Sequence, residues 1–554
     1  MVLYYMLLSL FIQNAERIEQ IMNKLHDIWS GGQLLAFSGI DGQTDFLNGL
    51  CLRTAMQGWT FELKKQDFQL PDAKIHYTGP APGKVELTGD FFKFHAGEKI
   101  SCGVLADSCN LLLAGEFSLE MTGDYEFLRE GERILIASKG FLKKEFLSAD
   151  PDELISQRAE FVLKAPIPDG VSETARRTAV KAWSQLKTQI YAPEGQITTR
   201  WSTPDRWPHK NMWLWDSVFH SLGARHYDVK LAKEMIHAMF DLQQPDGLIP
   251  HSGSPYSFHN CTQPPILSLA MRKLNEMDPD PEWIAELAPK LERHVQWMMA
   301  NRDSDGYGLL EWHIDAHVNC RSGESGMDNS PRFDGAIQLD APDFNAYVAY
   351  ECESLALFLP EKREFWQAQY ERLCQLMRER LWSDSCNMFV DYDVVANQRT
   401  DIMANSGFLP LYCGAATKEQ AAKMVEHLTN PETFGTPLRI PTIARKNVQA
   451  YKKDMWRGPV WININYLISL GLERYGYHDL ARSIMQDTMR EEEKWYLKHG
   501  TFFEFYDDRK ETDPKDLERK GKMPAKYNPF NQSFHDYGWS ATLYLEMINH
   551  PEWN

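Results

Sequence analysis

The sequence predicts a mainly α-helical protein in which a β-rich N-terminal domain precedes a closed ring of helices. Between about residues 30 and 163, short β-rich runs alternate with Gly and Pro, whereas after residue 170 apolar residues recur with the helical period of about 3.6 residues. The change falls at residues 164–170, where two prolines and a glycine are typical of a linker. A chain of 554 residues also exceeds the usual size of one core. We therefore predict an N-terminal domain over residues 1–165 and a helical domain over residues 170–554.

Four runs in the N-terminal part have the composition of strands. They are residues 84–88, 91–94, 117–121 and 133–137. Glycines stand between them, and glycine adopts the backbone conformations that tight turns require. Short runs separated by regularly spaced turns predict an antiparallel, sandwich-like sheet domain.

About a dozen helical segments follow the linker, by the spacing of their apolar residues. Capping signals begin three of them, at Ser172, at Asp280 with Pro281, and at Thr417 with Gln420. Further helices are predicted over residues 229–243, 257–277, 343–358, 362–381, 457–475, 478–497 and 537–548. Because no motif of about 30 to 45 residues repeats, an open solenoid is disfavoured. A toroid of paired helices, with a cleft formed by the connections at one end, fits better.

Composition narrows the classes of partner. With 59 basic and 77 acidic side chains the formal charge is −18, which opposes binding to nucleic acid or to an anionic membrane. The 17 tryptophans are many for this length. Most such rings pack in cores, but their flat apolar faces also suit sugar rings, so a carbohydrate cleft is the less common alternative, and small neutral or weakly anionic partners remain open. Nothing in the sequence indicates an oligomeric state.

The cysteines and the N-terminus indicate a compartment. Nine cysteines occur without a CxxC pair, so neither a zinc knuckle nor a redox dithiol is predicted, and reduced thiols fit a cytoplasmic protein. Residues 1–12 are apolar but too short to span a bilayer, and they lack the positive flank of a secretory signal. A periplasmic location follows if residues 1–15 act as an atypical signal. A start at Met22 is the other alternative.

The loop at residues 323–332 concentrates polar chemistry in a segment that its glycines and proline exclude from helix and strand. It carries the carboxylate of Asp328, the amide of Asn329, the hydroxyl of Ser330 and the guanidinium of Arg332. The alternative is a surface turn whose Asp and Asn bond their own backbone.

Tryptophans and carboxylates recur in the other connections. Substrate-binding candidates are Trp213, Trp215, Asp216, Gln244, Trp312, Arg457, Trp461 and Trp539. Trp213 and Trp215, two positions apart, would face nearly opposite sides of a helix, so at least one should contact something other than the core. Buried core tryptophans are the alternative interpretation. A lone histidine such as His251 is more often structural than catalytic.

A second carboxylate, Glu504, lies among aromatic residues in the run FFEFYD at residues 502–507. A solvent-facing strand residue is the alternative by pattern alone. The acidic residues that follow it, Asp507, Asp508 and Glu511, have the pattern of a solvated charge run.

Several motifs together resemble glycoside hydrolase family 63. They are WLWD at 213–216, QQPDGLIPH at 243–251, ESGMDNSPR at 324–332, WRGPVW at 456–461, FFEFYD at 502–507 and DYGW at 536–539. The likeness covers about residues 175–550 and is greatest to bacterial hydrolases of the mannosylglycerate and glucosylglycerate type, with distant kinship to trehalases.

The resemblance implies an (α/α)6 barrel that hydrolyses α-glycosidic bonds of a small glucoside or mannoside with inversion. It implies Asp328 as the general acid and Glu504 as the general base, with a glycone pocket lined by the WLWD and WRGPVW segments and Gln244. This chemistry demands no metal and no organic cofactor. As the acid, Asp328 must hold a proton, so Arg332 is expected to point away from it toward a structural partner or an anionic aglycone. Alternatives are a trehalase-type hydrolase, a lyase or cyclase on the same ring, and a non-catalytic sugar-binding toroid.

Overall fold

A computed structural model describes residues 25–65, 72–317, 320–521 and 533–553. It divides into two compact units. The first comprises residues 1–192, 205–209 and 495–501, and the second comprises residues 193–204, 210–494 and 502–554. The apolar run at residues 1–12 and the alternative start at Met22 lie outside the described residues.

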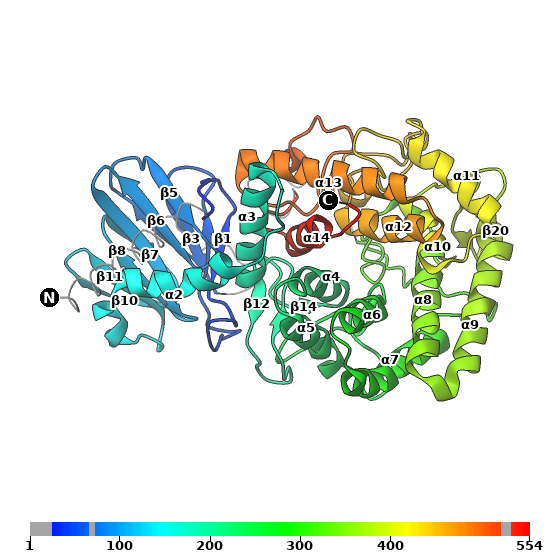
Figure 1. Cartoon of the computed structure of the whole chain (residues 1–554), viewed down its shortest axis with the longest axis horizontal. Coiled ribbons are helices and arrows are strands. Elements are labelled where there is room, and N and C mark those ends of the chain that lie inside the picture. The colour runs from blue at the N-terminus through cyan, green and yellow to red at the C-terminus, as the bar shows by residue number, and fades with distance from the viewer. Residues whose placement is uncertain (1–24, 66–71, 318–319, 522–532, 554) are drawn as a thin grey trace. The chain divides into compact units, whose positions relative to one another are not determined.

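The first unit contains two antiparallel sheets, drawn mainly in blue in Figure 1. One has the strand order β1-β2-β3-β4-β9 and the other β10-β11-β8-β7-β6-β5. Their bounds are β1 (Leu34–Ala36), β2 (Cys51–Thr54), β3 (Thr60–Lys64), β4 (Ala73–Tyr77), β5 (Lys84–Leu87), β6 (Phe91–Ala96), β7 (Lys99–Asp107), β8 (Asn110–Ala114), β9 (Phe117–Met121), β10 (Tyr125–Glu130) and β11 (Arg133–Ser138). The four predicted strands are β5, β6, β9 and β11. Side chains of both sheets meet in one core, where the rings of Phe61 and Phe92 stack 4.2 Å apart.

Two helices complete the first unit, α2 (Pro151–Lys164) and α3 (Glu173–Gln189). Ser172 caps α3 as predicted, because its side chain accepts a hydrogen bond from the backbone N–H of Ala175. The sequence placed the domain boundary at residues 164–170, whereas the compact units divide after Ala192, so α3 belongs to the first unit.

The second unit is helical (Figure 1). Its helices are α4 (Leu214–Ala224), α5 (Val229–Asp241), α6 (Leu267–Met277), α7 (Pro281–Asn301), α8 (Pro342–Phe358), α9 (Arg363–Leu376), α10 (Leu409–Cys413), α11 (Lys418–Thr429), α12 (Ile462–Arg474), α13 (His478–His499, whose last turn falls in the first unit) and α14 (Gly538–Ile548). The predicted caps at Asp280 and Thr417 are present, the latter as a complete capping box.

Two helices begin later in the structure than the sequence predicted. The helix predicted over 257–277 is α6, which begins only at Leu267, because Pro264 and Pro265 lack the N–H that a continuing helix would use. The helix predicted over 457–475 is α12, which begins at Ile462 after the Gly458-Pro459 break.

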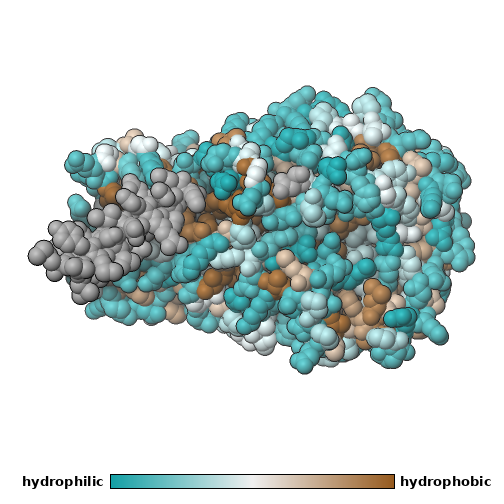
Figure 2. Space-filling model, in the orientation of Figure 1, coloured by the Kyte–Doolittle hydropathy of each residue, from teal (hydrophilic) through white to brown (hydrophobic). Residues whose placement is uncertain are grey.

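Six helices of the second unit pack in a cycle. Helix α4 contacts α6, α6 contacts α8, α8 contacts α10, α10 contacts α12, α12 contacts α14, and α14 returns to α4. Helices α5, α7 and α9 pack against members of this cycle. Within the described residues no helix is both long and apolar enough to cross a bilayer. The face seen in Figure 2 carries mainly hydrophilic residues.

A buried ion pair joins the last helix to the first of the cycle. Glu546 of α14 accepts bonds from Arg225 Nη2 at 2.8 Å, from His226 Nε2 at 2.7 Å and from the hydroxyl of Tyr466 at 3.0 Å. Burial alone raises the pKa of Glu546, but the bond from His226 and the charge of Arg225 outweigh it and lower the pKa to about 2. The carboxylate is therefore ionised and fastens α14 onto α4.

Removing this carboxylate should destabilise the second unit. A glutamate lowered from its usual pKa to about 2 contributes about 3 kcal/mol, present above pH ~4.5 and lost as pH falls through about 2. Glu546→Gln should lower the free energy of unfolding by about that amount at pH 7, and the difference from the parent protein should shrink between pH ~4.5 and 2. Urea unfolding across this range measures it. Glu552→Gln, at an exposed pair with His478, is the control, and equal shifts in both variants would contradict the assignment.

Candidate active site

The loop at residues 323–332 was predicted to carry a catalytic carboxylate. Most of its residues are buried, whereas that carboxylate is partly exposed. Each residue from 324 to 333 is buried apart from Asp328, whose side chain is 19% exposed. Gly326 has φ +70°, and a Cβ there would lie 2.5 Å from Cζ2 of Trp215. The close approach of the backbone to this ring requires glycine and sets the path of the loop before Asp328.

Two polar side chains beside Asp328 anchor the loop. Asn329 donates to Oδ1 of Asp454 at 3.1 Å and accepts from the backbone N–H of Trp456 at 3.0 Å. Arg332 is fully buried and binds Asp343 and Asp391 with two bonds each, at 2.6 to 2.9 Å. Burial opposes its charge, but these two carboxylates raise the pKa of Arg332 well above its ordinary value. The prediction that Arg332 points to a structural partner is confirmed.

The second carboxylate lies in a fully buried segment. Residues 501–508 are all buried, and Glu504 itself is 1% exposed. Arg519 donates two hydrogen bonds to Glu504, from Nε to Oε2 at 2.9 Å and from Nη2 to Oε1 at 3.3 Å. The guanidinium thus presents one N–H donor to each oxygen of Glu504, a fork that fixes the position of the carboxyl group.

A tryptophan cluster links the two segments. Trp456 stacks on Trp461 with ring centroids 3.7 Å apart, and Trp539 lies edge-on to Trp215 at 5.3 Å. Trp215 contacts the loop of Asp328 at Gly326, and Trp539 Nε1 lies 3.4 Å from the carbonyl oxygen of Glu504. All four rings are at least 98% buried. They hold the two carboxylate segments together by packing on one another.

Consecutive cations serve the two carboxylates. Arg519 binds Glu504, and the next residue, Lys520, places Nζ 2.5 Å from Oδ2 of Asp328. Burial works against the charge of Arg519, but Glu504 and also Asp328 raise its pKa. Asp328 and Glu504 therefore belong to one electrostatic group.

The other ionisable neighbours of Asp328 are uncharged at neutral pH. Burial, with a smaller effect of His259, lowers the pKa of His251 to about 4. Burial, with the charge of Asp328, raises the pKa of Cys320 to about 12. His251 shares close contacts with His259 and Cys261, at 3.1 Å each, which fits the structural role expected of it.

The remaining predicted residues are distributed over several parts of the second unit. Trp213 precedes α4 in an extended conformation, and its half-buried ring meets that of His251 at 4.9 Å. Asp216 is buried in the first turn of α4. Gln244 donates to Leu242 of its own loop at 2.7 Å, and Arg457 pairs with Asp334 at 2.5 Å. Asp334 borders a cavity of about 890 Å³, which lies at the C-terminal end of the loop that carries Asp328.

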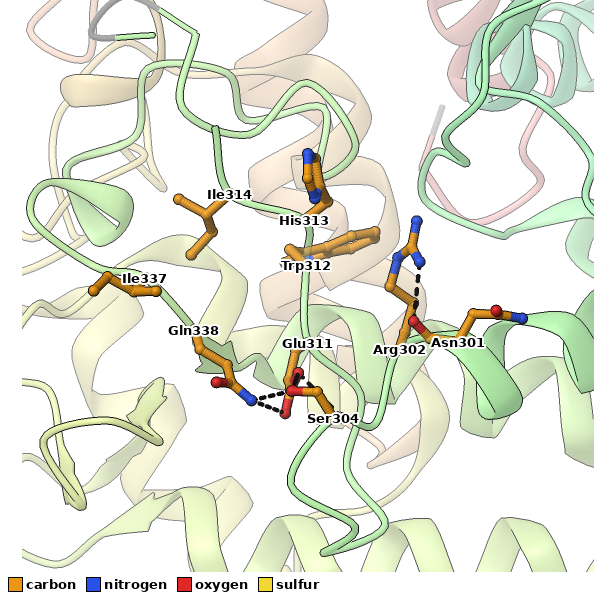
Figure 3. A pocket seen from close by; sticks show the side chains of 9 residues that line it. All are labelled: Asn301, Arg302, Ser304, Glu311, Trp312, His313, Ile314, Ile337 and Gln338. Carbon is orange, nitrogen blue, oxygen red and sulfur yellow. Dashed lines mark hydrogen bonds between the residues drawn. The ribbon is translucent and has the colours of Figure 1, made fainter. Parts of the chain in front are cut away.

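Trp312 belongs to a smaller cavity. It stacks on Phe344 at 3.8 Å and donates to Asp343, the partner of Arg332. Figure 3 shows Trp312 with Glu311 and His313 along a cavity of about 260 Å³, where Ser304 and Gln338 donate to Glu311.

Of the acidic run after Glu504, Glu511 is exposed as predicted, whereas Asp507 and Asp508 are buried, which corrects the prediction for these two residues. Asp507 and Asp508 are at most 1% exposed. Asp507 accepts from Lys453 and from two backbone N–H groups, and Asp508 accepts from the hydroxyl of Tyr451 at 2.6 Å. The three bonds to Asp507 offset the desolvation cost of its carboxylate, whereas burial raises the pKa of Asp508 to about 6.

Two groups among the described residues have the composition of a metal site. One brings carboxylate oxygens of Asp305, Glu311 and Asp340 within 4.8 Å of one another. Arg380 already pairs with two of them, Asp305 at 2.9 Å and Asp340 at 3.0 Å. The other, Glu473 with His478 and Glu552, is largely exposed. Neither group includes Asp328 or Glu504.

Sequence reasoning missed the two cations. Arg519 and Lys520 stand in the run ERKGK at residues 518–522, a basic patch in an acidic chain that is equally typical of a solvated loop. Only the fold brings them to Glu504 and Asp328.

Comparison with known proteins finds similarity to glycoside hydrolases. The sequence model described as "Mannosylglycerate hydrolase MGH1-like glycoside hydrolase domain" matches residues 209–540. The mannosylglycerate hydrolase MGH1 of Selaginella moellendorffii is 26% identical over 392 residues, covering 55% of this chain and 77% of the relative. A trehalase of Bombyx mori is 22% identical over 357 residues, covering 54% of this chain and 61% of the relative.

The fold has a matching solved structure. A GH63 mannosylglycerate hydrolase from Thermus thermophilus, solved in complex with glucose, is 24% identical with a TM-score of 0.54, covering 67% of this chain and 99% of that one. A further structure of that enzyme is in complex with Tris and D-glycerate.

The contact between Gly326 and Trp215 is testable with two alanines. Gly326 and Gly335 have nearly the same positive φ, +70° and +72°, but a Cβ at Gly335 meets nothing within 4 Å. Gly335→Ala should cost about 1 kcal/mol for the left-handed conformation alone. Gly326→Ala should cost about 1 to 3 kcal/mol more, because the methyl group collides with a buried ring. Urea unfolding followed by tryptophan fluorescence compares them. Equal losses would show that the loop does not depend on this approach.

Proposed function

Because the chain belongs to the mannosylglycerate hydrolase MGH1-like family of glycoside hydrolases, within glycoside hydrolase family 63, we propose that it cleaves the α-glycosidic bond of a small glucoside or mannoside with inversion. Asp328 is the general acid and Glu504 the general base of this proposal. The observation that carries it is that two carboxylates far apart in sequence share one tryptophan cluster and one pair of consecutive cations.

The proposed catalytic domain is an (α/α)6 barrel within residues 170–554, preceded by the β-rich domain of residues 1–165. The cycle of contacts from α4 through α6, α8, α10 and α12 to α14 supports six inner helices. The segment that carries Asp328 connects α7 to α8, and the segment that carries Glu504 connects α13 to α14. Two connections that each lead into a helix of the cycle support a shared site at one end of the proposed barrel.

In the proposed mechanism each carboxyl group transfers one proton: Asp328 donates one and Glu504 accepts one. Asp328 donates a proton to the glycosidic oxygen as the bond to the anomeric carbon breaks, while Glu504 takes a proton from the water that attacks the opposite face of the sugar. Arg519 donates two hydrogen bonds to Glu504 and fixes the position of its carboxyl group for this step. The partial exposure of Asp328 lets it regain its proton from solvent after each turnover.

The proposed substrate is a small carbohydrate, such as a glycosylglycerate. The half-buried ring of Trp213 and the carboxylate of Asp216 are the proposed glycone contacts, with Gln244, Trp215, Trp312, Arg457, Trp461 and Trp539 around them. The names of the relatives, which are mannosylglycerate hydrolases and a trehalase, support this class. We place the enzyme in the cytoplasm, because nine cysteines without a CxxC pair fit the reduced thiols of that compartment.

Amide replacement of either carboxylate should remove most activity. Asp328→Asn cannot donate the proton and Glu504→Gln cannot accept one, so each should lower kcat by about 10² to 10⁴-fold. Release of free sugar from a panel of α-glucosides, α-mannosides, trehalose and glycosylglycerates measures this. Glu511→Gln, a nearby exposed carboxylate, should keep full activity. Near-normal turnover in either catalytic variant would reassign the role.

The stereochemical course is a separate test. An inverting enzyme acting on an α-glycoside must release the β-anomer first. Proton NMR during the first minutes of hydrolysis distinguishes the two anomers before they equilibrate. Initial release of the α-anomer would exclude the proposed mechanism, and ultraviolet absorption by an unsaturated product would identify a lyase instead. Sugar binding with a tryptophan fluorescence change but without free sugar would identify a non-catalytic binder.

A further inference from the structure

Asp454 lies between the two segments that carry the ion pair of Asp328 and Lys520. Its Oδ1 accepts a hydrogen bond from the side-chain amide of Asn329 at 3.1 Å, and its Oδ2 accepts one from the backbone N–H of Gly521 at 3.0 Å. Each donor directly follows one member of the ion pair in the chain. One carboxyl group therefore joins both halves of the pair, one residue away from each.

The backbone on either side of Asp454 binds the same segment at a second point. The N–H of Glu518 donates to the carbonyl oxygen of Lys453 at 3.1 Å, and its carbonyl oxygen accepts from the N–H of Met455 at 3.0 Å. The two cations, at residues 519 and 520, lie between this backbone contact and the bond to Oδ2 of Asp454. Both ends of the short stretch that carries them are thus fixed.

The bond from Gly521 also acts on the conformation of Lys520. Lys520 has a φ of +58°, in the left-handed region that is unfavourable for a residue with a Cβ, and Gly521 follows with a φ of +81°. Such a turn persists only where the surrounding structure holds it, and Oδ2 of Asp454 is the acceptor that does so. Without this acceptor the turn would relax, and Nζ of Lys520 would move relative to Asp328.

The interior does not favour a carboxylate at this position. Asp454 is 5% exposed, and burial raises its pKa, to which the charge of Glu518 adds. The bonds from Gly521 and Asn329, with the charge of Arg457, act in the opposite direction. An asparagine would fill nearly the same volume without a charge to desolvate. It could not accept from two N–H donors, however, because one end of its amide is itself a donor.

We propose that Asp454 is a positioning residue that sets the place of the general acid, Asp328, relative to the general base, Glu504. It acts through Asn329 on the side of the acid and through the stretch of Arg519 on the side of the base, and it takes no proton itself. The inference rests on the proposed function, from which it takes the roles of the two carboxylates. An inverting pair needs a separation of about 6.5 to 9.5 Å that admits one water, so the spacing of the two segments has to be fixed.

The first variant removes one acceptor and keeps the shape of the side chain. Asp454→Asn offers one oxygen to two N–H donors, so one bond is lost. Asn329 cannot compensate by turning its amide over, because its oxygen accepts from the N–H of Trp456. On an α-glycoside that the parent protein cleaves, kcat should fall by about 10 to 100-fold, since a misplacement of about 1 Å can cost about 10²-fold. KM should stay within about threefold, because contacts made equally in the ground and transition states remain.

The second variant exchanges the amide and the carboxylate. Asp454→Asn combined with Asn329→Asp keeps one of each at the two positions. The amide then accepts from Gly521 and donates to the new carboxylate, which still accepts from Trp456, so all three bonds form again. Asn329→Asp alone places two carboxylates face to face and should also lower kcat, because like charges repel. The double variant should exceed the kcat of each single variant at least about fivefold.

A matched control separates position from stability. Glu546→Gln removes the buried ion pair that joins α14 to α4, which lies outside the candidate site. It should lower the free energy of unfolding and leave kcat unchanged. Urea unfolding and steady-state kinetics are measured for each full-length protein under conditions in which all of them are folded.

The outcomes distinguish this inference from the proposed function. Near-parental kcat in Asp454→Asn would overturn the positioning role while the glycosidase remains. A double variant no faster than either single variant would also overturn it, because the lost bonds would then not be the cause. An equal loss of kcat in Glu546→Gln would assign the effect to stability instead. A parent protein that cleaves no α-glycoside would overturn the proposed function, and the inference with it.

Discussion

The buried guanidinium of Arg332 is the interaction on which the candidate site depends. It is fully enclosed, and such a charge is stable in a protein interior only when every direction offers a partner. Asp343 of α8 and Asp391 after the α9 segment supply those partners with four bonds. The loop that carries Asp328 is thereby tied to two separate parts of the helical unit, and its carboxylate is placed by a rigid frame.

The tryptophans reveal a second constraint. Excess aromatic residues suggested platforms for sugar rings, yet Trp215, Trp456, Trp461 and Trp539 pack on one another and are almost completely buried. Such a cluster buries a large apolar area and fixes ring positions through close contact. The tryptophan cluster acts on the site indirectly, because it holds the loop of Asp328 beside the segment of Glu504. The half-buried Trp213 is the ring that keeps access to solvent.

Charge pairing then divides the work between neighbouring residues. Arg519 binds Glu504 through a fork of two hydrogen bonds, while Lys520 pairs with Asp328 as a single point charge. A buried charge is also paired at Asp507, which accepts a bond from Lys453, while its neighbour Asp508 accepts one from the hydroxyl of Tyr451.

The sequence by itself determined the elements and the chemistry. Periodicity and capping residues located most helices and four of the eleven strands β1–β11, and the motifs around Asp328 and Glu504 singled out two carboxylates, because these signals are local. It erred where local signals compete, as at Pro264 and Pro265, which delay α6 to Leu267. Tertiary structure alone decided which helices close the cycle, that Arg332 is buried against Asp343 and Asp391, and that Lys520 meets Asp328. Those pairings depend on segments distant in sequence, and burial, which sets their strength, has no local signature.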